Sequence, residues 1–243
     1  EVENLLSQLD SLSFKDKRES YLKKQLTAVE TILKILRGEE LTLKEQVESI
    51  LDIEYSWVEE EHFEEGLEFF KQGLPGKGDL IDRYGIWIQR NMYSFESSKD
   101  KYDYLKFIIN EMQDRTNKIM DLPDNEDINL EIVTDKRYGA STRYLGNLVS
   151  LVEINDDIPF NFYQLLPLIT HELYPGHHTE FCLKENHLIK EKGYFENNVF
   201  LLTSPQLVIS EGLGEVGFDM IFTPQEAAVW MNENIYKKFE IKT

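Results

Sequence analysis

The sequence predicts a mainly α-helical fold, with a small β-sheet beside the helices that carry a metal site. Apolar residues recur at helical spacing through most of residues 1 to about 120. Two short runs rich in β-branched and aliphatic residues, 130–133 and 148–154, follow and are typical of strands. With 41% apolar and 29% charged residues, the 243-residue chain has the composition of an ordinary globular protein with a sizeable core.

The N-terminal half is expected to be a succession of helices. Leucine, isoleucine and valine recur at helical spacing from Phe14 to Arg37, and Gly38 is placed to end that helix. Thr42 and Glu45 form a capping-box pattern at the start of the next helix, which we expect to run to about residue 53. Further helices are expected over residues 57–72, 79–92 and 98–120.

The second half is expected to combine the two strands with further helices. Helix resumes from about Asn161, and two more helices are expected over 205–220 and 223–239. Strand 148–154 is either an edge strand, which could pair with an extended peptide substrate, or an ordinary buried strand. No flexible linker is evident, so we expect one continuous domain. Its parts are an N-terminal helical region, 1–122, and a metal-site region, 123–243.

Charge and cysteine content narrow the class of protein. A formal charge of −19 argues against binding to nucleic acid, which needs clustered Lys and Arg. No apolar stretch reaches the roughly 18 residues of a transmembrane helix, so no membrane span is expected. Cys182 is the only cysteine, which excludes an intrachain disulfide and fits a cytoplasmic protein. Because the chain begins with Glu1 rather than Met, a trimmed export signal remains an alternative.

The strongest functional signal is a cluster of histidines. Four of the five fall within 17 residues, namely His171, His177, His178 and His187. His171 lies near the end of an expected helix and is followed directly by Glu172. A His-Glu pair on a helix, with another histidine soon after, is typical of zinc hydrolase sites. There the imidazoles bind the metal and the glutamate acts as general base toward water.

The spacing of this cluster requires a break in the helix. The position four residues after His171, where the second ligand usually stands, is Pro175, which cannot bind a metal. In an unbroken helix His178 would lie about 10 Å along the axis from His171, too far to share an ion. Pro175 and Gly176 predict a kink that brings the next residue into reach. We therefore favour His177 as the second ligand and keep His178 as the alternative.

Residues 171–178, His-Glu-Leu-Tyr-Pro-Gly-His-His, resemble the HExxPGHH signature of the DUF885 family. That family is a large group of mostly uncharacterised bacterial proteins placed among the zincin-type metallopeptidases. Its second motif, Glu-Gly-Trp, is similar to Glu211-Gly212, with Leu213 in place of the aromatic residue. The resemblance spans roughly residues 137–232. It implies a zincin-like fold, one Zn²⁺ ion and peptidase activity.

A third ligand is expected on a separate element. A catalytic zinc ion uses three protein ligands, and without a suitable cysteine the third should be a carboxylate, for which Glu211 is the best candidate. Glu215 lies one turn further along the expected helix and could accept a hydrogen bond from a ligating imidazole. The nearby glycines at 212, 214 and 217 predict that this helix packs closely against another backbone.

These residues predict a zinc-dependent hydrolase, with a peptide or a small amide as the expected substrate. Tyr144, Tyr174 and Arg143 are candidates for polarising the substrate carbonyl. Imidazole and carboxylate ligands suit zinc, although another divalent ion remains an alternative. Two other functions remain open. The chain could hydrolyse non-peptide amides or esters, or it could be a non-catalytic helical binding module or inactive fragment that keeps the motif.

Overall fold

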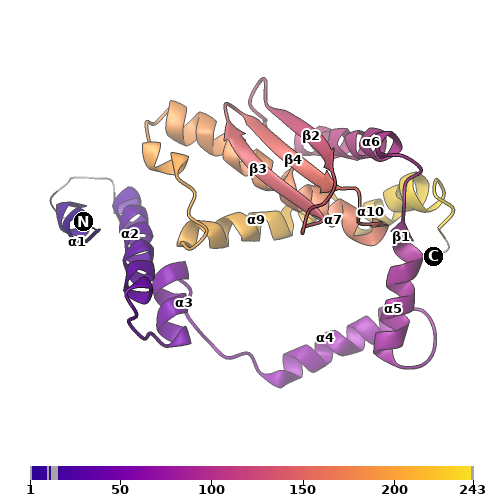
Figure 1. Cartoon of the computed structure of the whole chain (residues 1–243), viewed down its shortest axis with the longest axis horizontal. Coiled ribbons are helices and arrows are strands. Elements are labelled where there is room, and N and C mark those ends of the chain that lie inside the picture. Colours follow the sequence, from indigo (N-terminus) through magenta and orange to yellow (C-terminus); the bar gives the residue numbers. More distant parts are fainter. Residues whose placement is uncertain (1, 10, 12–15, 242–243) are drawn as a thin grey trace. The chain divides into compact units, whose positions relative to one another are not determined.

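The computed structural model describes residues 2–9, 11 and 16–241 and confirms that the chain is mainly α-helical with a small β-sheet (Figure 1). Contacts divide it into two compact units. The first comprises the described residues up to Val58 together with Asn198–Gly212, and the second comprises Glu59–Asn197 and the described residues from Leu213 on. The predicted boundary near residue 122 is therefore not where the chain divides. The helix that precedes residue 122 packs against the sheet and belongs to the second unit.

The first unit contains helices α1 (Val2–Leu9), α2 (Asp16–Leu36) and α3 (Leu43–Leu51). The predicted start of α2 at Phe14 lies outside the described residues. Gly38, at a φ of +88°, follows the end of α2, as expected of a glycine after a helix. The capping box at Thr42 is present: Thr42 accepts a hydrogen bond from the Glu45 backbone N–H, while the Glu45 carboxylate accepts one from the Thr42 N–H at 2.8 Å.

The second unit begins with three of the predicted helices. They are α4 (Glu60–Gly73), α5 (Leu80–Asn91) and α6 (Ser98–Thr116), and their ends lie within a few residues of the predicted ones. Asp79 and Ser97 cap α5 and α6 by accepting hydrogen bonds from backbone N–H groups. Of the three, α6 is the most buried and supplies much of the core.

A three-stranded sheet follows, in the order β2–β4–β3 (Figure 1). Its strands are β2 (Asp127–Val133), β3 (Ala140–Gly146) and β4 (Val149–Asn155). Strand β4 pairs parallel with β2 and antiparallel with β3. The two predicted strands are present, but the sequence analysis missed β3. Because β4 lies in the centre with both edges paired, the interpretation of 148–154 as an edge strand for a substrate is wrong.

One face of the sheet forms the core of the second unit together with the helices. Buried residues alternate along the strands, with Ile128 and Leu130 on β2 level with Ser150 and Val152 on β4. Helix α6 lies beside β2 (Figure 1). The core also takes buried side chains from α6 and from the helix that ends at the site: Leu105, Ile108, Met112, Leu165, Leu166 and Ile169.

The remaining elements include the three helices that carry the predicted metal ligands. A two-stranded sheet joins β1 (Met92–Tyr93) to β5 (Phe160–Asn161) and leads directly into α7 (Phe162–Glu172). After it come α8 (His177–Leu183), the π-helix η1 (Lys184–Lys190), the 3₁₀ turn η2 (Phe195–Asn198), α9 (Pro205–Ile221), α10 (Pro224–Met231) and the π-helix η3 (Asn232–Tyr236). None of the helices in the described ranges combines the length and apolar character needed to cross a bilayer.

Candidate metal centre

The backbone breaks where the Pro-Gly pair predicts it. Helix α7 ends at Glu172, the Leu173 N–H still donates to the Ile169 carbonyl at 2.9 Å, and α8 begins at His177. The Tyr174–Pro175 peptide bond between them is cis. The chain therefore turns within four residues and starts a new helix at the second histidine of the motif.

The turn requires a glycine at position 176, because a side chain would not fit there. A Cβ there would lie 1.8 Å from the carbonyl oxygen of His171 and 2.4 Å from that of Thr170. These contacts are with backbone atoms that cannot move aside without opening the end of α7. The glycine thus allows the start of α8 to fold back tightly against the end of α7, which brings His177 close to His171.

His171, His177 and Glu211 form a cluster that could hold a metal ion. Each offers one ligand atom, and these atoms all lie within 4.8 Å of one another. The two imidazole rings meet edge to face, with centroids 4.7 Å apart and an interplanar angle of 85°. Tetrahedral zinc with bonds of about 2.1 Å holds its ligand atoms about 3.4 Å apart. Small side-chain rotations would reach that spacing, so the donor set fits the ion.

Glycines bring helix α9 against the end of α7. A Cβ at Gly214 would lie 2.8 Å from ring atoms of His171, and one at Gly217 would lie 3.0 Å from the Thr170 carbonyl oxygen. The predicted close approach therefore occurs at these two glycines, whereas Gly212 has nothing within 4 Å. Since α9 is one continuous helix, the contact at Gly214 also sets the position of Glu211, one turn earlier.

The two other acidic candidates lie next to the cluster. Glu172 is the last residue of α7, and its half-buried carboxylate makes no hydrogen bond or ion pair with any described residue. Glu215 lies one turn after Glu211, with its Oε1 3.7 Å from Nδ1 of His171. That distance is too long for a hydrogen bond, so Glu215 is an exposed acidic neighbour of the imidazole.

A further carboxylate approaches the second histidine and was missed by the sequence analysis. Oε2 of Glu180 lies 4.0 Å from Nδ1 of His177, and the Glu180 side chain is 4% exposed. Lys184, one turn further along, forms an ion pair with the other oxygen of Glu180. A buried carboxylate beside a candidate ligand imidazole is an arrangement that orients such rings in metal sites.

His178 is not available as a metal ligand, which excludes the alternative to His177. Its side chain is fully buried. Ser150 Oγ lies 2.7 Å from its Nδ1, and Oε2 of Glu126 lies 2.7 Å from its Nε2. Because an ionised carboxylate can only accept, Nε2 donates to Glu126, and Nδ1 shares a hydrogen bond with the Ser150 hydroxyl. Both ring nitrogens of His178 thus have hydrogen-bond partners inside the protein.

Glu126 is the centre of this buried network. It accepts hydrogen bonds from His178, from the Tyr174 hydroxyl and from the Gln113 amide. Burial alone would raise the pKa of the Glu126 carboxyl, but these three donors together hold it below its usual value. Glu126 and Ser150 were not predicted from the sequence because they lie far from the motif along the chain. The need of a buried histidine for two partners is the one signal that could have pointed to them.

Two of the three candidates for polarising a carbonyl, Tyr174 and Tyr144, are engaged in hydrogen bonds. The Tyr174 hydroxyl is buried and donates to Glu126. The Tyr144 hydroxyl donates to Glu185 at 2.6 Å and accepts from the Leu148 N–H at 3.1 Å. Burial, together with the bond to Glu185, raises the pKa of Tyr144. Neither hydroxyl is therefore free to donate to a substrate.

Arg143, the third such candidate, is exposed on the edge strand β3 and makes no ion pair with the described residues. The remaining histidine of the cluster, His187, is also exposed. Its Nδ1 lies 3.1 Å from Oε1 of Glu191, the residue directly after the end of η1. His187 is thus not part of the group of possible metal ligands found among the described residues.

Comparisons with known proteins show the fold and leave the activity open. No family model and no curated protein matches the sequence. One solved structure, described as "the putative lipoprotein from Colwellia psychrerythraea", matches with a TM-score of 0.58 and 16% sequence identity. The match covers 96% of this chain, and this chain spans 46% of that structure. At this identity the likeness shows a shared fold alone.

Proposed function

We propose that this protein is a zinc-dependent hydrolase with a zincin-like site, and that it cleaves peptide bonds. The observation that carries the proposal is the convergence of His171, His177 and Glu211, whose ligand atoms lie within 4.8 Å of one another. Two imidazoles and one carboxylate, drawn from three helices, form the ligand set of the His₂Glu class of catalytic zinc sites. The resemblance of residues 171–178 to the HExxPGHH signature supports the same class.

In the proposed reaction a bound zinc ion and Glu172 have separate roles. A bound zinc ion would supply Lewis acidity, lowering the pKa of water at the site and polarising the scissile carbonyl. Glu172 lies next to ligand His171 and carries no hydrogen bond from the described residues, so its carboxylate is free to take a proton. In the proposed reaction Glu172 takes that proton from the attacking water and donates it to the leaving amine.

Two carboxylates, those of Glu180 and Glu215, lie next to the proposed ligand imidazoles. Glu180 is buried beside His177 and is itself paired with Lys184, so it lies in a fixed position. Glu215 is exposed beside His171. A carboxylate that hydrogen-bonds a ligating imidazole fixes the ring tautomer and raises the basicity of the ligating nitrogen, and its loss usually weakens metal binding by roughly 10–100-fold. Glu180 is the better placed of the two for this role, because it is buried and held by Lys184.

A glutamine at position 172 tests the proposal. Purified wild-type protein, loaded with zinc, should contain one ion per chain and cleave a mixture of unstructured peptides. The Glu172→Gln variant should keep the zinc, because residue 172 is no ligand, and should lose most of the cleavage, because the general base is gone. His171→Ala should lose both. Full retention of cleavage in Glu172→Gln would overturn the mechanism.

The same preparation separates the alternatives. Cleavage of esters or non-peptide amides with peptides left intact would show a hydrolase of another substrate class. One zinc ion per chain without hydrolysis of any of these substrates, at the same value for wild type and Glu172→Gln, would show a structural metal site. If the wild type bound no zinc while remaining folded by circular dichroism, a zinc hydrolase of either substrate class and a structural zinc site would both be excluded.

A further inference from the structure

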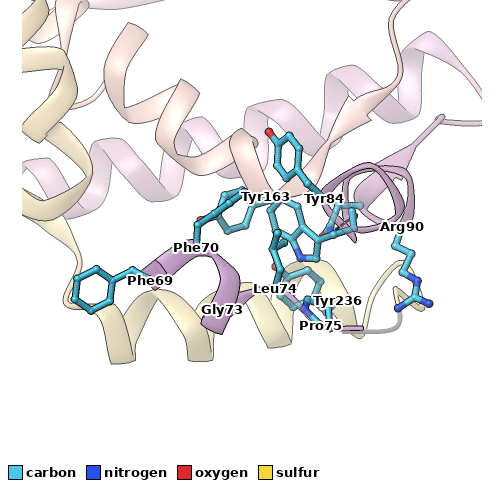
Figure 2. Close-up of a pocket in the computed structure, with 11 residues that line it drawn as sticks. Phe69, Phe70, Gly73, Leu74, Pro75, Tyr84, Arg90, Tyr163 and Tyr236 are labelled. Atoms are coloured by element: carbon cyan, nitrogen blue, oxygen red, sulfur yellow. Dashed lines mark hydrogen bonds between the residues drawn. The ribbon is translucent and has the colours of Figure 1, made fainter. Parts of the chain in front are cut away.

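The second unit contains an aromatic cavity that the proposed hydrolase site does not use. It has a volume of about 590 Å³, within the range of small-molecule sites. The end of α4, the following loop and α5 form most of its wall, and α7 and η3 complete it (Figure 2). The lining residues are Phe69, Phe70, Gly73, Leu74, Pro75, Tyr84, Trp87, Arg90, Asn91, Tyr163 and Tyr236.

The walls of this cavity, which we call the aromatic cavity, are a connected set of rings. Phe70 meets Tyr84 edge to face at 5.2 Å between centroids, and Tyr84 stacks with Trp87 at 6.1 Å. Trp87 meets Tyr163 of α7 edge to face at 4.4 Å. Because each ring contacts the next, the wall is held in place, and a ligand would meet prearranged aromatic faces.

The loop that closes one side of the aromatic cavity is also fixed. The Arg83 guanidinium, from α5, donates to the Lys71 carbonyl at 2.8 Å and to the Leu74 carbonyl. Leu74 itself is 6% exposed and packs into the unit. The turn from α4 to α5 is therefore tied to α5 from within, which keeps the cavity open.

Arg90 is the one charged side chain among the lining residues. It is exposed and extends from α5 at one end of the group, with Phe69 at the opposite end in the view (Figure 2). It makes no ion pair or hydrogen bond with any described residue. Arg90 is thus a guanidinium without an acidic partner at the edge of an apolar cavity, although the chain has a net charge of −19.

From these observations we propose that the aromatic cavity binds a small aromatic molecule bearing a carboxylate or similar anionic group. The rings would stack with its apolar part, and Arg90 would pair with its charge, the geometry for which guanidinium is best suited. No carboxylate, histidine or cysteine lines the cavity, so it carries no hydrolytic or metal chemistry of its own.

The aromatic cavity is separate from the metal centre. Both include a residue of α7, but Tyr163 stands at its start and His171 eight residues later. At 1.5 Å per residue that is about 12 Å along the helix axis. The proposal is therefore independent of the hydrolase, and binding should persist when the metal ligands are removed.

A matched pair of probes tests both parts of the proposal. Naphthalene-1-acetate and naphthalene-1-acetamide share their rings and differ in charge. In equilibrium dialysis the full chain should bind one naphthalene-1-acetate per molecule, and about tenfold more tightly than the amide, as expected for a charge-assisted pair. Arg90→Gln should remove that preference and leave the amide's affinity unchanged. An undiminished preference for the acetate in Arg90→Gln would overturn the role of Arg90.

A glycine in the wall allows the cavity to be filled without altering the rings. Gly73 lines the aromatic cavity, and a Cβ there would meet no atom within 4 Å. Gly73→Leu should weaken binding of both probes at least tenfold. Gly66→Leu is the matched control, since Gly66 lies on the same helix, is equally open and lies outside the lining set. Equal binding by the two variants, or saturable binding of neither probe to the wild type, would overturn the proposal.

Removal of the metal site separates this result from the hydrolase. His171→Ala should bind naphthalene-1-acetate as the wild type does, whatever its zinc content or activity. If His171→Ala lost the probe while remaining folded by circular dichroism, the binding would belong to the metal centre, and the assignment to the aromatic cavity would be wrong.

Discussion

Gly214 of α9 lies against the imidazole of His171, so closely that a Cβ on this glycine would stand 2.8 Å from ring atoms Cε1 and Nδ1. Such a contact is shorter than any ordinary van der Waals separation, and the neighbouring atom is a ring that the proposed site must hold in place. The absence of a side chain at residue 214 thus links two elements that the proposed metal would join: the end of α7 and the helix that carries Glu211.

Gly214→Ala should impair the metal site without unfolding the chain. The added methyl group would push His171 or α9 aside by a few tenths of an ångström or more, so we expect zinc affinity to fall by at least about tenfold. Gly212→Ala is the matched control, because its Cβ meets nothing. In a helix interior, Gly212→Ala should raise the free energy of unfolding by up to about 1 kcal/mol. Competition titration with a zinc chelator and urea unfolding measure the two effects, and equal zinc affinity in both variants would contradict the expectation.

His177 and His178 are adjacent in the sequence but should respond in opposite ways. His177→Ala should lower zinc affinity about 100-fold or more, since it removes a proposed ligand, and should destabilise the metal-free protein less than His178→Ala does, since position 177 is only half-buried. His178→Ala should lower the free energy of unfolding by about 3 kcal/mol, because it removes one of the three donors to the buried carboxylate of Glu126 and the partner of the buried Ser150 hydroxyl.

The same measurements on His187→Ala provide the baseline for that pair. His187 is exposed, so its removal should change neither zinc affinity nor stability. A loss of zinc in His178→Ala greater than in His177→Ala, at temperatures where both are folded, would reverse the assignment of the second ligand.

Glu126 should make stability depend on pH in the acid range. Its hydrogen bonds hold its pKa in the folded chain below 4.5, so the ionised carboxylate stabilises the fold fully above pH 4.5. That contribution is lost as the pH falls below 4.5 through the folded-state pKa. Glu126→Gln should be less stable than wild type by about 1–3 kcal/mol at pH 7. Urea unfolding from pH 7 to pH 3 should show this gap narrowing below pH 4.5, and a constant gap would contradict the role of the charge.

Lys101 of α6 forms a buried ion pair that should contribute far more to the free energy of unfolding than the exposed ion pair of Lys99 on the same helix. Its Nζ lies 2.6 Å from Asp156 Oδ1, and its side chain is 3% exposed. A hydrogen bond from Lys101 holds the pKa of Asp156 below its usual value. Lys101→Met should lower the free energy of unfolding by about 3 kcal/mol, since Asp156 loses its buried counter-charge. Lys99→Met removes the exposed pair with Asp103 and should leave chemical unfolding unchanged within error. An equal loss of stability in both variants would show that the contribution of the Lys101–Asp156 pair does not depend on its burial.

Local patterns in the sequence were enough to predict most of the secondary structure and the proximity of His171 to His177. The capping box at Thr42, the helix that delivers His171 and the break at Pro175-Gly176 all depend on residues within one or two turns of each other. Chemistry confined to so short a stretch is determined by side-chain type and spacing. For the same reason the sequence predicted that His171 and His177 would be neighbours.

Tertiary structure alone decided which partners meet across long stretches of chain. His178 matches the motif as well as His177 does, yet it is bound inside the protein by Glu126, 52 residues earlier. Strand β4 proved central because β3, which no clear alternation predicts, pairs along its second edge. The aromatic cavity likewise depends on rings from α4, α5 and α7 coming together. Such pairings depend on packing between distant segments, and a short stretch of sequence does not determine the free energy of that packing.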